Sequence, residues 1–432
     1  MPPLVHPIGK AIQTCALCVA LHLLSPVLAF GFSRPDISRL KLGTNAPVVS
    51  ALSAIIVDDK TGKVLWSKDS DTPRFPASTT KIMTGLLLAE RCKPDDIIVA
   101  PEDVQTVTES SMHLKPGERV RARDMLYALM LRSANDGCYA VAMHISGSVE
   151  KFAALMNARA KEMGCLHTHF HNSNGLNDPQ HTISARDLAC IARTAMKNPW
   201  FRETVGTYRM QINRSLNWKD TWMVNHNKSL RHDPSADGIK TGYTVPAGHC
   251  FVGSATRNGY RLVTVILKSK NWQQDNSSMM KWAFSNFERV SIASQGLELA
   301  KAEIPGSSEP SIPIGLSQSI DSPVHKSIAA QVWEPMPPIF VAMPGLIAPI
   351  KKGDVVGTLE FADKEGFTLK SPSIALSDAP ASAALLVRQK TNSVGMWAFG
   401  AIIGGSALVV RRKRQRIYAR STSTTSPTPP IC

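Results

Sequence analysis

Three short motifs in this chain carry side chains that could perform acyl transfer. The first is Ser78-Thr79-Thr80-Lys81, in which a hydroxyl and an amine stand three residues apart. On a helix, residues at i and i+3 share one face, one turn apart. A serine hydroxyl is a weak nucleophile until a base takes its proton, and a neutral lysine amine can serve as that base. Ser78 and Lys81 are therefore candidates for a nucleophile and its general base.

The other two motifs place polar groups in a loop and on a strand. Ser133-Ala134-Asn135 lies in a predicted break between two helices, and Lys240-Thr241-Gly242 lies on a predicted strand. Each motif is weak by itself, because such short patterns also arise by chance from ordinary composition. The chance matches in this chain are Ser148-Val149-Glu150-Lys151, Ser215-Leu216-Asn217 and Lys60-Thr61-Gly62.

The elements predicted around the motifs separate them from these chance matches. Apolar residues at helical spacing predict a mostly buried helix that begins at Ser78 and ends near Cys92. Further helices are expected at 122–131, 136–146, 149–163, 184–197 and 277–290, and strands at 51–58, 63–67, 238–244, 249–256 and 260–267. A helical block between two groups of strands predicts an α+β fold in which helices pack on an antiparallel sheet.

The C-terminal third has a different character. Residues 304–325 are rich in Pro, Ser and Gly, which indicates a boundary or a linker-like insertion. β-prone runs around it predict a small all-β domain over about 291–386, after a catalytic domain at 45–290. Five cysteines fall between the two ends of the chain, and their pairing stays open. These cysteines are Cys92, Cys138, Cys165, Cys190 and Cys250.

Both ends of the chain carry the features of an exported, anchored protein. Residues 1–29 combine a basic start, an apolar middle and a small-residue site, which is typical of a signal peptide. The uncharged stretch 391–410 is long enough for a transmembrane helix, and the basic tail 411–432 marks the cytoplasmic side. Gly400 and Gly404 form a GxxxG pair that could join two such helices in a dimer.

Composition excludes several other classes of protein. The chain has 49 Lys and Arg against 34 Asp and Glu, a formal net charge of +15, part of which lies in the basic tail. No basic stripe with interleaved aromatic residues is visible, so nucleic-acid binding is not expected. His167, His169 and His171 alternate in one segment, but they lack carboxylate neighbours of suitable spacing, and no metal or cofactor is expected.

Taken in order, the motifs resemble those of the low-molecular-weight penicillin-binding proteins of the D-alanyl-D-alanine carboxypeptidase type. The resemblance covers about residues 45–290, and more loosely the small β domain and the C-terminal anchor. It includes the segments Pro76 to Thr84, Met130 to Asp136, Asn174 to Ala189 and Asp237 to Gly248. It implies the penicillin-binding/β-lactamase-like transpeptidase fold and a serine DD-carboxypeptidase that trims peptidoglycan stem peptides, with β-lactams as covalent inhibitors. The expected location is the bacterial cell envelope.

The resemblance also implies a role for each motif residue. Ser78 would attack the carbonyl of the penultimate D-Ala, Lys81 would accept its proton, and Ser133 would relay a proton to the leaving amine. In substrate binding, Asn135 would hydrogen-bond the peptide amide, and Lys240 and Thr241 would bind the terminal carboxylate. Gly242 would leave room at the strand edge for an extended peptide. The backbone N–H groups of Tyr243 and Ser78 would stabilise the oxyanion.

One departure from the family keeps alternatives open. The family often carries an Arg past the last core strand, whereas Lys270 and Asp275 stand at that place here, which leaves the second carboxylate contact undecided. A DD-endopeptidase that cuts cross-links would share every residue above, and a non-catalytic wall-binding protein is the alternative from another class. A class A β-lactamase would need a deacylating Glu, and Glu162 lacks the expected neighbours.

Overall fold

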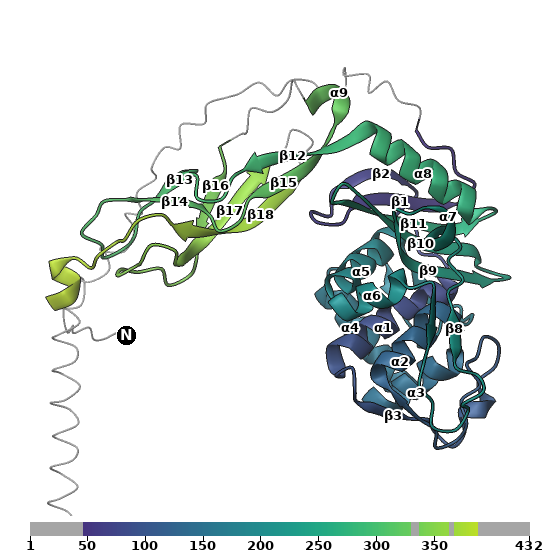
Figure 1. Cartoon of the computed structure of the whole chain (residues 1–432). Coiled ribbons are helices and arrows are strands. Elements are labelled where there is room, and N and C mark those ends of the chain that lie inside the picture. The colour runs from purple at the N-terminus through teal and green to yellow at the C-terminus, as the bar shows by residue number, and fades with distance from the viewer. Residues whose placement is uncertain (1–45, 330–336, 363–366, 388–432) are drawn as a thin grey trace, which may run out of the picture. The chain divides into compact units, whose positions relative to one another are not determined.

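The structure, a computed structural model, describes residues 46–329, 337–362 and 367–387 of the chain (Figure 1). The helices are η2 (Ala77–Thr80), α1 (Lys81–Arg91), η3 (Val104–Thr106), α2 (Ala122–Tyr127), η4 (Ala128–Arg132), α3 (Asn135–Ser146), α4 (Val149–Glu162), α5 (Ala185–Lys197), α6 (Pro199–Gly206), α7 (Ser229–His232), α8 (Trp272–Asn286) and α9 (Lys326–Ala329). The strands are β1 (Ser53–Asp58), β2 (Val64–Lys68), β3 (Ile97–Val99), β4 (Arg119–Arg121), β5 (Thr168–His169), β6 (Thr182–Ile183), β7 (Arg209–Gln211), β8 (Trp222–Val224), β9 (Ala236–Thr244), β10 (Gly248–Arg257), β11 (Tyr260–Ser269), β12 (Phe287–Ala293), β13 (Ala300–Ala302), β14 (Ile312–Leu316), β15 (Ile320–His325), β16 (Ile339–Ala342), β17 (Val355–Ala362) and β18 (Thr368–Ala375).

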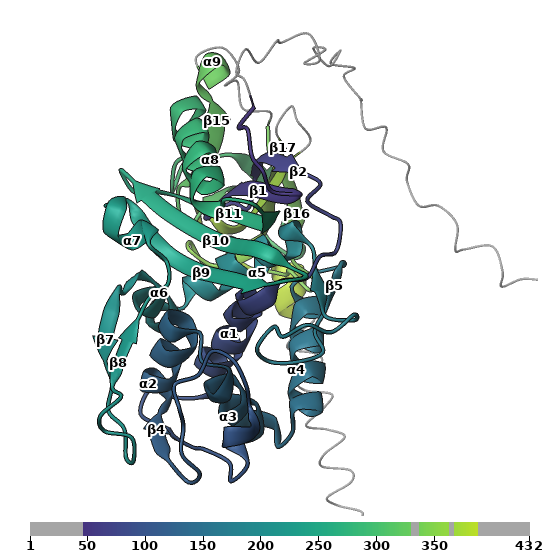
Figure 2. The same ribbon diagram turned by 90° about the vertical axis from the view of Figure 1, so that its right-hand side faces the viewer.

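A five-stranded antiparallel sheet in the order β2-β1-β11-β10-β9 organises residues 46–290. Both faces of its central strands are covered, because all six residues of β1 are buried. Alternate residues of that strand enter different cores: Ile55 and Val57 join the core with α1 and α5, while Ile56 joins the core with α8. The α8 helix lies on the opposite face of the sheet from α1, α5 and α6 (Figure 1 and Figure 2).

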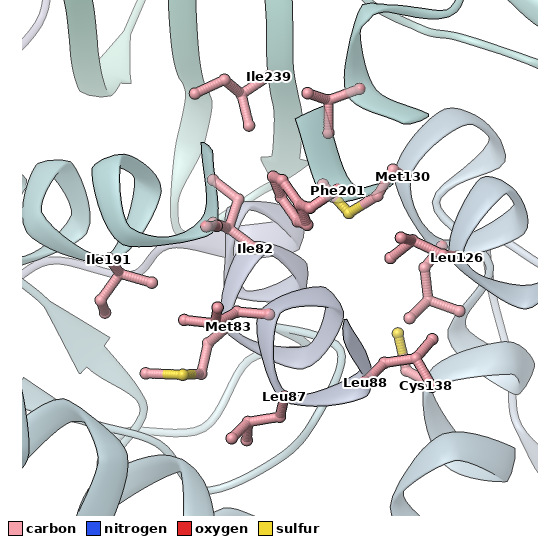
Figure 3. Close-up of a cluster of buried hydrophobic side chains, with 14 of the residues drawn as sticks. Ile82, Met83, Leu87, Leu88, Leu126, Met130, Cys138, Ile191, Phe201 and Ile239 are labelled. Carbon is pink, nitrogen blue, oxygen red and sulfur yellow. The ribbon is translucent and has the colours of Figure 1, made fainter. Parts of the chain in front are cut away.

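Helix α1 runs through the middle of the helical block, so it is buried along most of its length. All eight of its residues from Lys81 to Leu88 are buried. Figure 3 shows its apolar side chains surrounded by side chains from the neighbouring elements, among them Leu126, Met130, Cys138, Ile191, Phe201 and Ile239. A helix that is covered on all sides has an accurately fixed position, which matters because its first residue is Lys81.

The predicted helix at Ser78 begins differently from the expectation. Ser78 lies in the 3₁₀ turn η2, and the α-helix begins only at Lys81. The turn is preceded by Pro76, and its first residue, Ala77, has a φ of 49°, a left-handed conformation outside the α-helical region. In a 3₁₀ turn the side chains at i and i+3 eclipse one another, so Ser78 and Lys81 still face the same way.

The C-terminal strands form a separate sheet in the order β13-β14-β18-β17-β16, and β12 pairs with β15. This sheet has its own apolar core, which includes Ile312, Ile314 and Leu316 of β14. The prediction of a linker-like insertion at 304–325 is therefore wrong. Four of the five residues of β14 are buried despite the surrounding Pro, Ser and Gly, and Pro313 still accepts a hydrogen bond from Leu376 N through its carbonyl.

One further expectation needs correction, and those for the two ends of the chain lie outside the described residues. The helix expected at 277–290 is α8, which ends at Asn286, because the chain then turns into β12 and pairs with β15. Within the described ranges, no helix has both the length and the apolar character needed to cross a bilayer. The predicted signal peptide at 1–29, the span at 391–410 with Gly400 and Gly404, and the tail at 411–432 lie outside those ranges.

Candidate active site

The nucleophile turn η2 is held by the chain on both sides of it. The amide of Thr79 and its hydroxyl both donate to the carbonyl of Pro76, at 3.3 and 2.7 Å. Just before, Arg74 exchanges two backbone hydrogen bonds with Ile183, each 2.9 Å long. These contacts fix the backbone that presents the Ser78 hydroxyl.

The Lys81 side chain is buried and makes three polar contacts. Its Nζ lies 2.9 Å from Ser78 Oγ, 2.8 Å from Asn135 Oδ1 and 2.7 Å from the backbone oxygen of Asn174. The last two oxygens can only accept hydrogen bonds. When the amine is neutral, its two N–H groups therefore belong to Asn135 and Asn174, and its lone pair faces the Ser78 hydroxyl. This is the arrangement that a general base for Ser78 requires.

Two buried lysines lie near each other in this site. Lys81 has no exposed surface and Lys240 only 1%. Burial lowers the pKa of Lys81, because its three partners are neutral oxygens that do not replace the lost hydration of an ammonium. Burial and the neighbouring Lys81 together lower the pKa of Lys240 to about 7. Near neutral pH the site can thus hold one neutral amine and one ammonium.

The second motif lies where η4 ends and α3 begins. Ser133 has a φ of 66°, which ends η4, and its buried Oγ has no hydrogen-bond partner within the described part of the chain. Asn135 is the first residue of α3, and its Nδ2 donates to the carbonyl of Thr108 at 3.0 Å. Its carboxamide therefore joins Lys81 to the loop that contains Thr108. One further hydrogen bond remains possible at each end of that carboxamide.

Asp136, which follows this motif, organises the loop in front of α3. Its carboxylate accepts hydrogen bonds from the amides of Met112 and Leu114 and from the Ser111 hydroxyl, at 2.7 to 3.0 Å. Asp136 does not cap α3, because the N-cap residue of this helix is Ala134. The buried carboxylate instead ties residues 111–114 to the start of this helix.

The third motif lies on β9, at the edge of the five-stranded sheet. Only β10 pairs with β9 among the described strands, so its other edge can accept an extended peptide. Lys240 points inward and donates to the carbonyl of Thr241 at 3.1 Å. The side chain of Tyr243 is 57% exposed and its ring lies 4.7 Å from that of His249.

Gly242 brings this strand against the nucleophile turn. A Cβ atom at Gly242 would lie 3.0 Å from the amide nitrogen of Ser78 and 3.1 Å from that of Thr79. The sequence predicted Gly242 to leave space for a substrate at the strand edge. Its position shows that the absence of a side chain also allows β9 to approach the backbone of Ser78.

The segment 172–176 contributes a contact that the motifs did not reveal. Asn174 offers its backbone oxygen to Lys81, and a side chain on Gly175 would collide with the carbonyl oxygen of Ala77. Asn172 holds this segment through its side chain, which accepts from Gly175 N at 2.7 Å and donates to the oxygen of Leu176 at 3.0 Å. Every residue has a backbone carbonyl, so the residue type at position 174 could not predict the contact with Lys81. In the sequence, only the glycine at position 175 could have indicated a close approach of this segment.

The two residues noted in place of the family Arg have separate positions. Asp275 is buried and accepts from the amides of Ser50 and Ala51 and from the hydroxyl of Ser269, so it has a structural role. Lys270 is exposed and follows β11, whose residue Ser269 pairs with His249. The structure thus leaves Lys270, and not Asp275, free to approach an anion near that end of β9 and β10.

The chance matches have ordinary structural roles. Ser148 caps α4 by accepting from Lys151 N, and Ser215 Oγ accepts from Arg119 N. Lys60 forms an exposed ion pair with Asp321. The tertiary structure therefore gathers Ser78, Lys81, Asn135 and the β9 motif, and leaves the matching motifs elsewhere on the surface.

The arrangement as a whole is suited to acyl transfer. It combines a hydroxyl, an adjacent amine of lowered pKa, a second cation beside a free strand edge, and backbone amides at the nucleophile turn. A peptide laid along β9 as an added strand would pass in front of Ser78, because Gly242 is in contact with that turn.

Comparison with known proteins points to one family. The family model described as D-alanyl-D-alanine carboxypeptidase matches residues 41–271, and the model of the penicillin-binding protein 5 C-terminal domain matches residues 287–380. These two matches fall on the five-stranded sheet with its helices and on the C-terminal strands, respectively.

Individual relatives give the same result. The chain is 31% identical over 358 residues to D-alanyl-D-alanine carboxypeptidase DacF of Bacillus subtilis (strain 168), covering 80% of this chain and 90% of that protein. It is 30% identical to DacD of Salmonella typhimurium (strain LT2), with 83% and 91% covered. Penicillin-binding protein 5 from Haemophilus influenzae has the same fold, with a TM-score of 0.65 at 24% identity, over 78% of this chain and all of that chain.

Proposed function

Because this chain belongs to the D-alanyl-D-alanine carboxypeptidase family of serine peptidases, we propose that it removes the terminal D-Ala from peptidoglycan stem peptides through an acyl-enzyme on Ser78. The observation that carries this proposal is the contact between Lys81 Nζ and Ser78 Oγ, with both remaining partners of the amine able only to accept hydrogen bonds.

In the first step, the lone pair of Lys81 takes the proton of Ser78 as Oγ attacks the carbonyl carbon of the penultimate D-Ala. The negative charge that develops on the carbonyl oxygen is stabilised by the backbone N–H groups of Ser78 and Tyr243. Gly242 supports this assignment, because it brings the β9 backbone close to that of Ser78.

In the second step, the tetrahedral intermediate collapses and the terminal D-Ala leaves as an amine. Ser133, whose buried hydroxyl has no hydrogen-bond partner among the described residues, gives its proton to this amine and receives in return the proton that Lys81 took from Ser78, so that Lys81 is neutral again. Asn135 donates or accepts one further hydrogen bond with the peptide amide. Water then attacks the ester as Lys81 removes one of its protons. When the bond to Ser78 Oγ breaks, Lys81 gives this proton to Oγ, and the shortened peptide is released as a carboxylic acid.

The terminal carboxylate of the substrate binds beside Lys240 and Thr241. Lys240 is buried next to another amine, so an anion at this place gains an attraction that water would otherwise weaken. Because a β-lactam carries a comparable carboxylate and an acylating carbonyl, we expect it to acylate Ser78 as well.

The experiment that tests the proposal combines labelling with a fluorescent penicillin and measurement of D-Ala release from a peptide that ends in D-Ala-D-Ala. The wild-type protein should be labelled stoichiometrically, and Ser78→Ala should lose both labelling and release, by about 10⁴-fold or more. Ser148→Ala is the matched control, since Ser148 stands in the same four-residue pattern but only caps α4. Release of D-Ala by Ser78→Ala at the parent rate would refute the assignment.

The same residues would serve an endopeptidase, so the products must be identified. Incubation with cross-linked and with linear muropeptides separates the two activities. We expect release of free D-Ala from linear pentapeptides, in line with the names of the relatives. Cleavage of cross-links alone would favour the endopeptidase. A protein that neither binds penicillin nor cleaves either substrate would be a wall-binding protein.

We also propose that the protein is exported by residues 1–29 and anchored in the cytoplasmic membrane by residues 391–410, with residues 291–386 as a spacer domain. The basic tail that follows the apolar stretch supports this orientation. Deletion of residues 388–432 should move the penicillin-labelled protein from the membrane fraction to the soluble envelope fraction. Retention in the membrane would contradict this anchor, and the dimer through Gly400 and Gly404 would then lose its basis.

A further inference from the structure

One buried imidazole lies between the nucleophile-bearing turn and the segment that holds Lys81. His181 is only 1% exposed, and it contacts Thr80 on one side and the backbone of residues 171–172 on the other. We propose that His181 is a positioning residue for acylation, which holds these two segments in register so that the Lys81 lone pair faces Ser78. The inference rests on the proposed function and adds a residue to its machinery.

The hydrogen bonds of His181 determine which ring nitrogen carries the proton. Nδ1 lies 3.0 Å from the amide nitrogen of His171 and 3.3 Å from that of Asn172, and both amides can only donate. Nδ1 must therefore be the unprotonated acceptor, and the proton lies on Nε2. Nε2–H then donates to Thr80 Oγ1, at 2.9 Å. The ring has no freedom to change its tautomer without losing these bonds.

The segment that His181 holds is the one that reaches Lys81. Asn172, whose amide donates to His181, also orders the next residues, because its Oδ1 accepts from Asn174 N at 3.2 Å and from Gly175 N at 2.7 Å. Asn174 then presents its carbonyl oxygen to Lys81 Nζ. A chain of contacts through Asn172 and Asn174 thus connects the imidazole to the general base.

The other side of the ring reaches the same base by a shorter route. Thr80 is buried and directly precedes Lys81, in the turn that also contains Ser78. Its hydroxyl is the acceptor for His181. The imidazole therefore fixes the distance between the turn that carries Ser78 and Lys81 and the carbonyl that orients the Lys81 amine.

The charge state of His181 suits this role. Burial, and to a smaller extent the neighbouring His171, His169 and Lys81, lower its pKa to about 4, although Asp178 acts in the opposite direction. The ring of Phe170 also packs edge-on against it, with centroids 5.6 Å apart. The imidazole therefore stays neutral well above pH 4, and Nδ1 remains an acceptor.

Two substitutions distinguish the roles of the two ring nitrogens of His181. His181→Asn keeps an acceptor near the position of Nδ1 but loses the donor to Thr80, whereas His181→Gln keeps a donor near Nε2 but leaves the two loop amides unpaired. We expect each to reduce the second-order rate constant of acylation by a penicillin about 10- to 100-fold, because small displacements of a catalytic base have effects of that size. Thr80→Val, which removes the bond from the other side, should resemble His181→Asn.

The rate must be measured per active site, with the burst of penicillin labelling giving the concentration of folded enzyme. The acid limb of the pH–rate profile should also move to higher pH, because water that reaches Lys81 through the loosened segment raises its pKa. His169→Gln is the matched control. It makes the same chemical change on an exposed imidazole whose Nδ1 bonds to the backbone oxygen of Gln180, and it should leave both readouts unchanged.

The outcomes are distinct. In one outcome, the His181 variants give a smaller burst of labelling, which means less folded enzyme, while the acylation rate per active site and the acid limb of the pH–rate profile stay unchanged. That result would mean that His181 only stabilises the fold, and it would overturn the inference. Wild-type rates in all three variants would overturn it as well. If the wild-type protein is not labelled at all, the proposed function fails first and this inference fails with it.

Discussion

At the scale of single residues, the site depends on two lysines that are kept out of water. Lys81 contacts only neutral oxygens, and Lys240 donates to a backbone carbonyl, so neither ammonium has the stabilisation that a carboxylate partner would give. Burial therefore favours the neutral amine at both positions. In the proposed mechanism only Lys81 needs to be neutral, whereas Lys240 needs its charge to bind the substrate carboxylate.

These opposite requirements predict a pH profile with two limbs. The rate of acylation should rise with pH as Lys81 loses its proton, and the affinity for a peptide with a free carboxylate should fall above about pH 7 as Lys240 loses its own. Steady-state kinetics with a D-Ala-D-Ala peptide and with its C-terminal amide check this. The loss of affinity at high pH should be absent for the amide. An identical alkaline limb for both substrates would contradict the role of Lys240.

The same pKa predicts that Lys240 reduces stability. Its pKa of about 7 in the folded state is below the value of 10.5 for an exposed lysine, so the unfolded chain binds more protons between these two values. The free energy of unfolding therefore rises with pH over that window. Lys240→Met should raise the Tm by about 5 °C or more at pH 6.5, and by much less at pH 10, while abolishing activity. An equal change in Tm at both pH values would show that another effect dominates.

At the scale of elements, two glycines allow separate segments to meet at the nucleophile turn. Gly242 lets β9 approach the Ser78 amide, and Gly175 lets the segment that carries Asn174 lie against Ala77. A short turn with a left-handed residue at its start is thus enclosed from two directions. The position of Ser78 depends on these contacts as well as on the helix that follows.

Substitution of one of these glycines tests that enclosure. Gly175→Ala should lower the Tm strongly and reduce acylation at least 10-fold, since the new Cβ would collide with the carbonyl oxygen of Ala77. Gly147→Ala is the matched control, because Gly147 also has a positive φ, 75° against 90°, but no atom of the described chain lies within 4 Å of the position that its new methyl group would take. It should cost only about 1 kcal/mol of stability. Equal effects of the two substitutions, measured by thermal unfolding and penicillin labelling, would argue against the enclosure.

At the scale of the whole molecule, the described chain contains apolar cores that belong to different parts of the sequence. Two cores lie on the two faces of the five-stranded sheet, and a third is built only from residues between Ile292 and Leu385. The polar groups of the candidate site belong to the first 290 residues alone. The C-terminal strands therefore can lose stability without any change in the geometry around Ser78.

A core substitution in the C-terminal sheet should lower the free energy of unfolding without changing the rate of acylation. Ile314→Ala removes a fully buried side chain from β14 and should cost about 2–5 kcal/mol in the unfolding of that part. The rate of acylation per active site should stay within about twofold of the wild-type value, since no group of the site belongs to that core. Calorimetry and penicillin labelling on the full chain measure the two effects. A parallel loss of acylation would mean that the site depends on the C-terminal sheet.

The sequence alone determined the type of fold and most residues of the candidate site. Hydrophobic periodicity predicted β1, β2, α1 and the three strands from 236 to 269, because burial of one face leaves a regular pattern of apolar residues. The motif residues Ser78, Lys81 and Lys240 stood out because their side chains carry the chemistry. Both the apolar pattern and the motif residues are local features, so a single sequence is enough to detect them.

Only the tertiary structure decided what surrounds those residues. The carbonyl of Asn174 and the imidazole of His181 act on Lys81 and its neighbour Thr80 from about a hundred positions further along the chain, and a backbone oxygen has no residue type to recognise. The pKa of Lys81 likewise depends on burial by elements that are distant in sequence. The residue types of the candidate reactive groups can therefore be recognised in the local sequence. Their orientation and protonation depend on packing, which is a property of the folded chain.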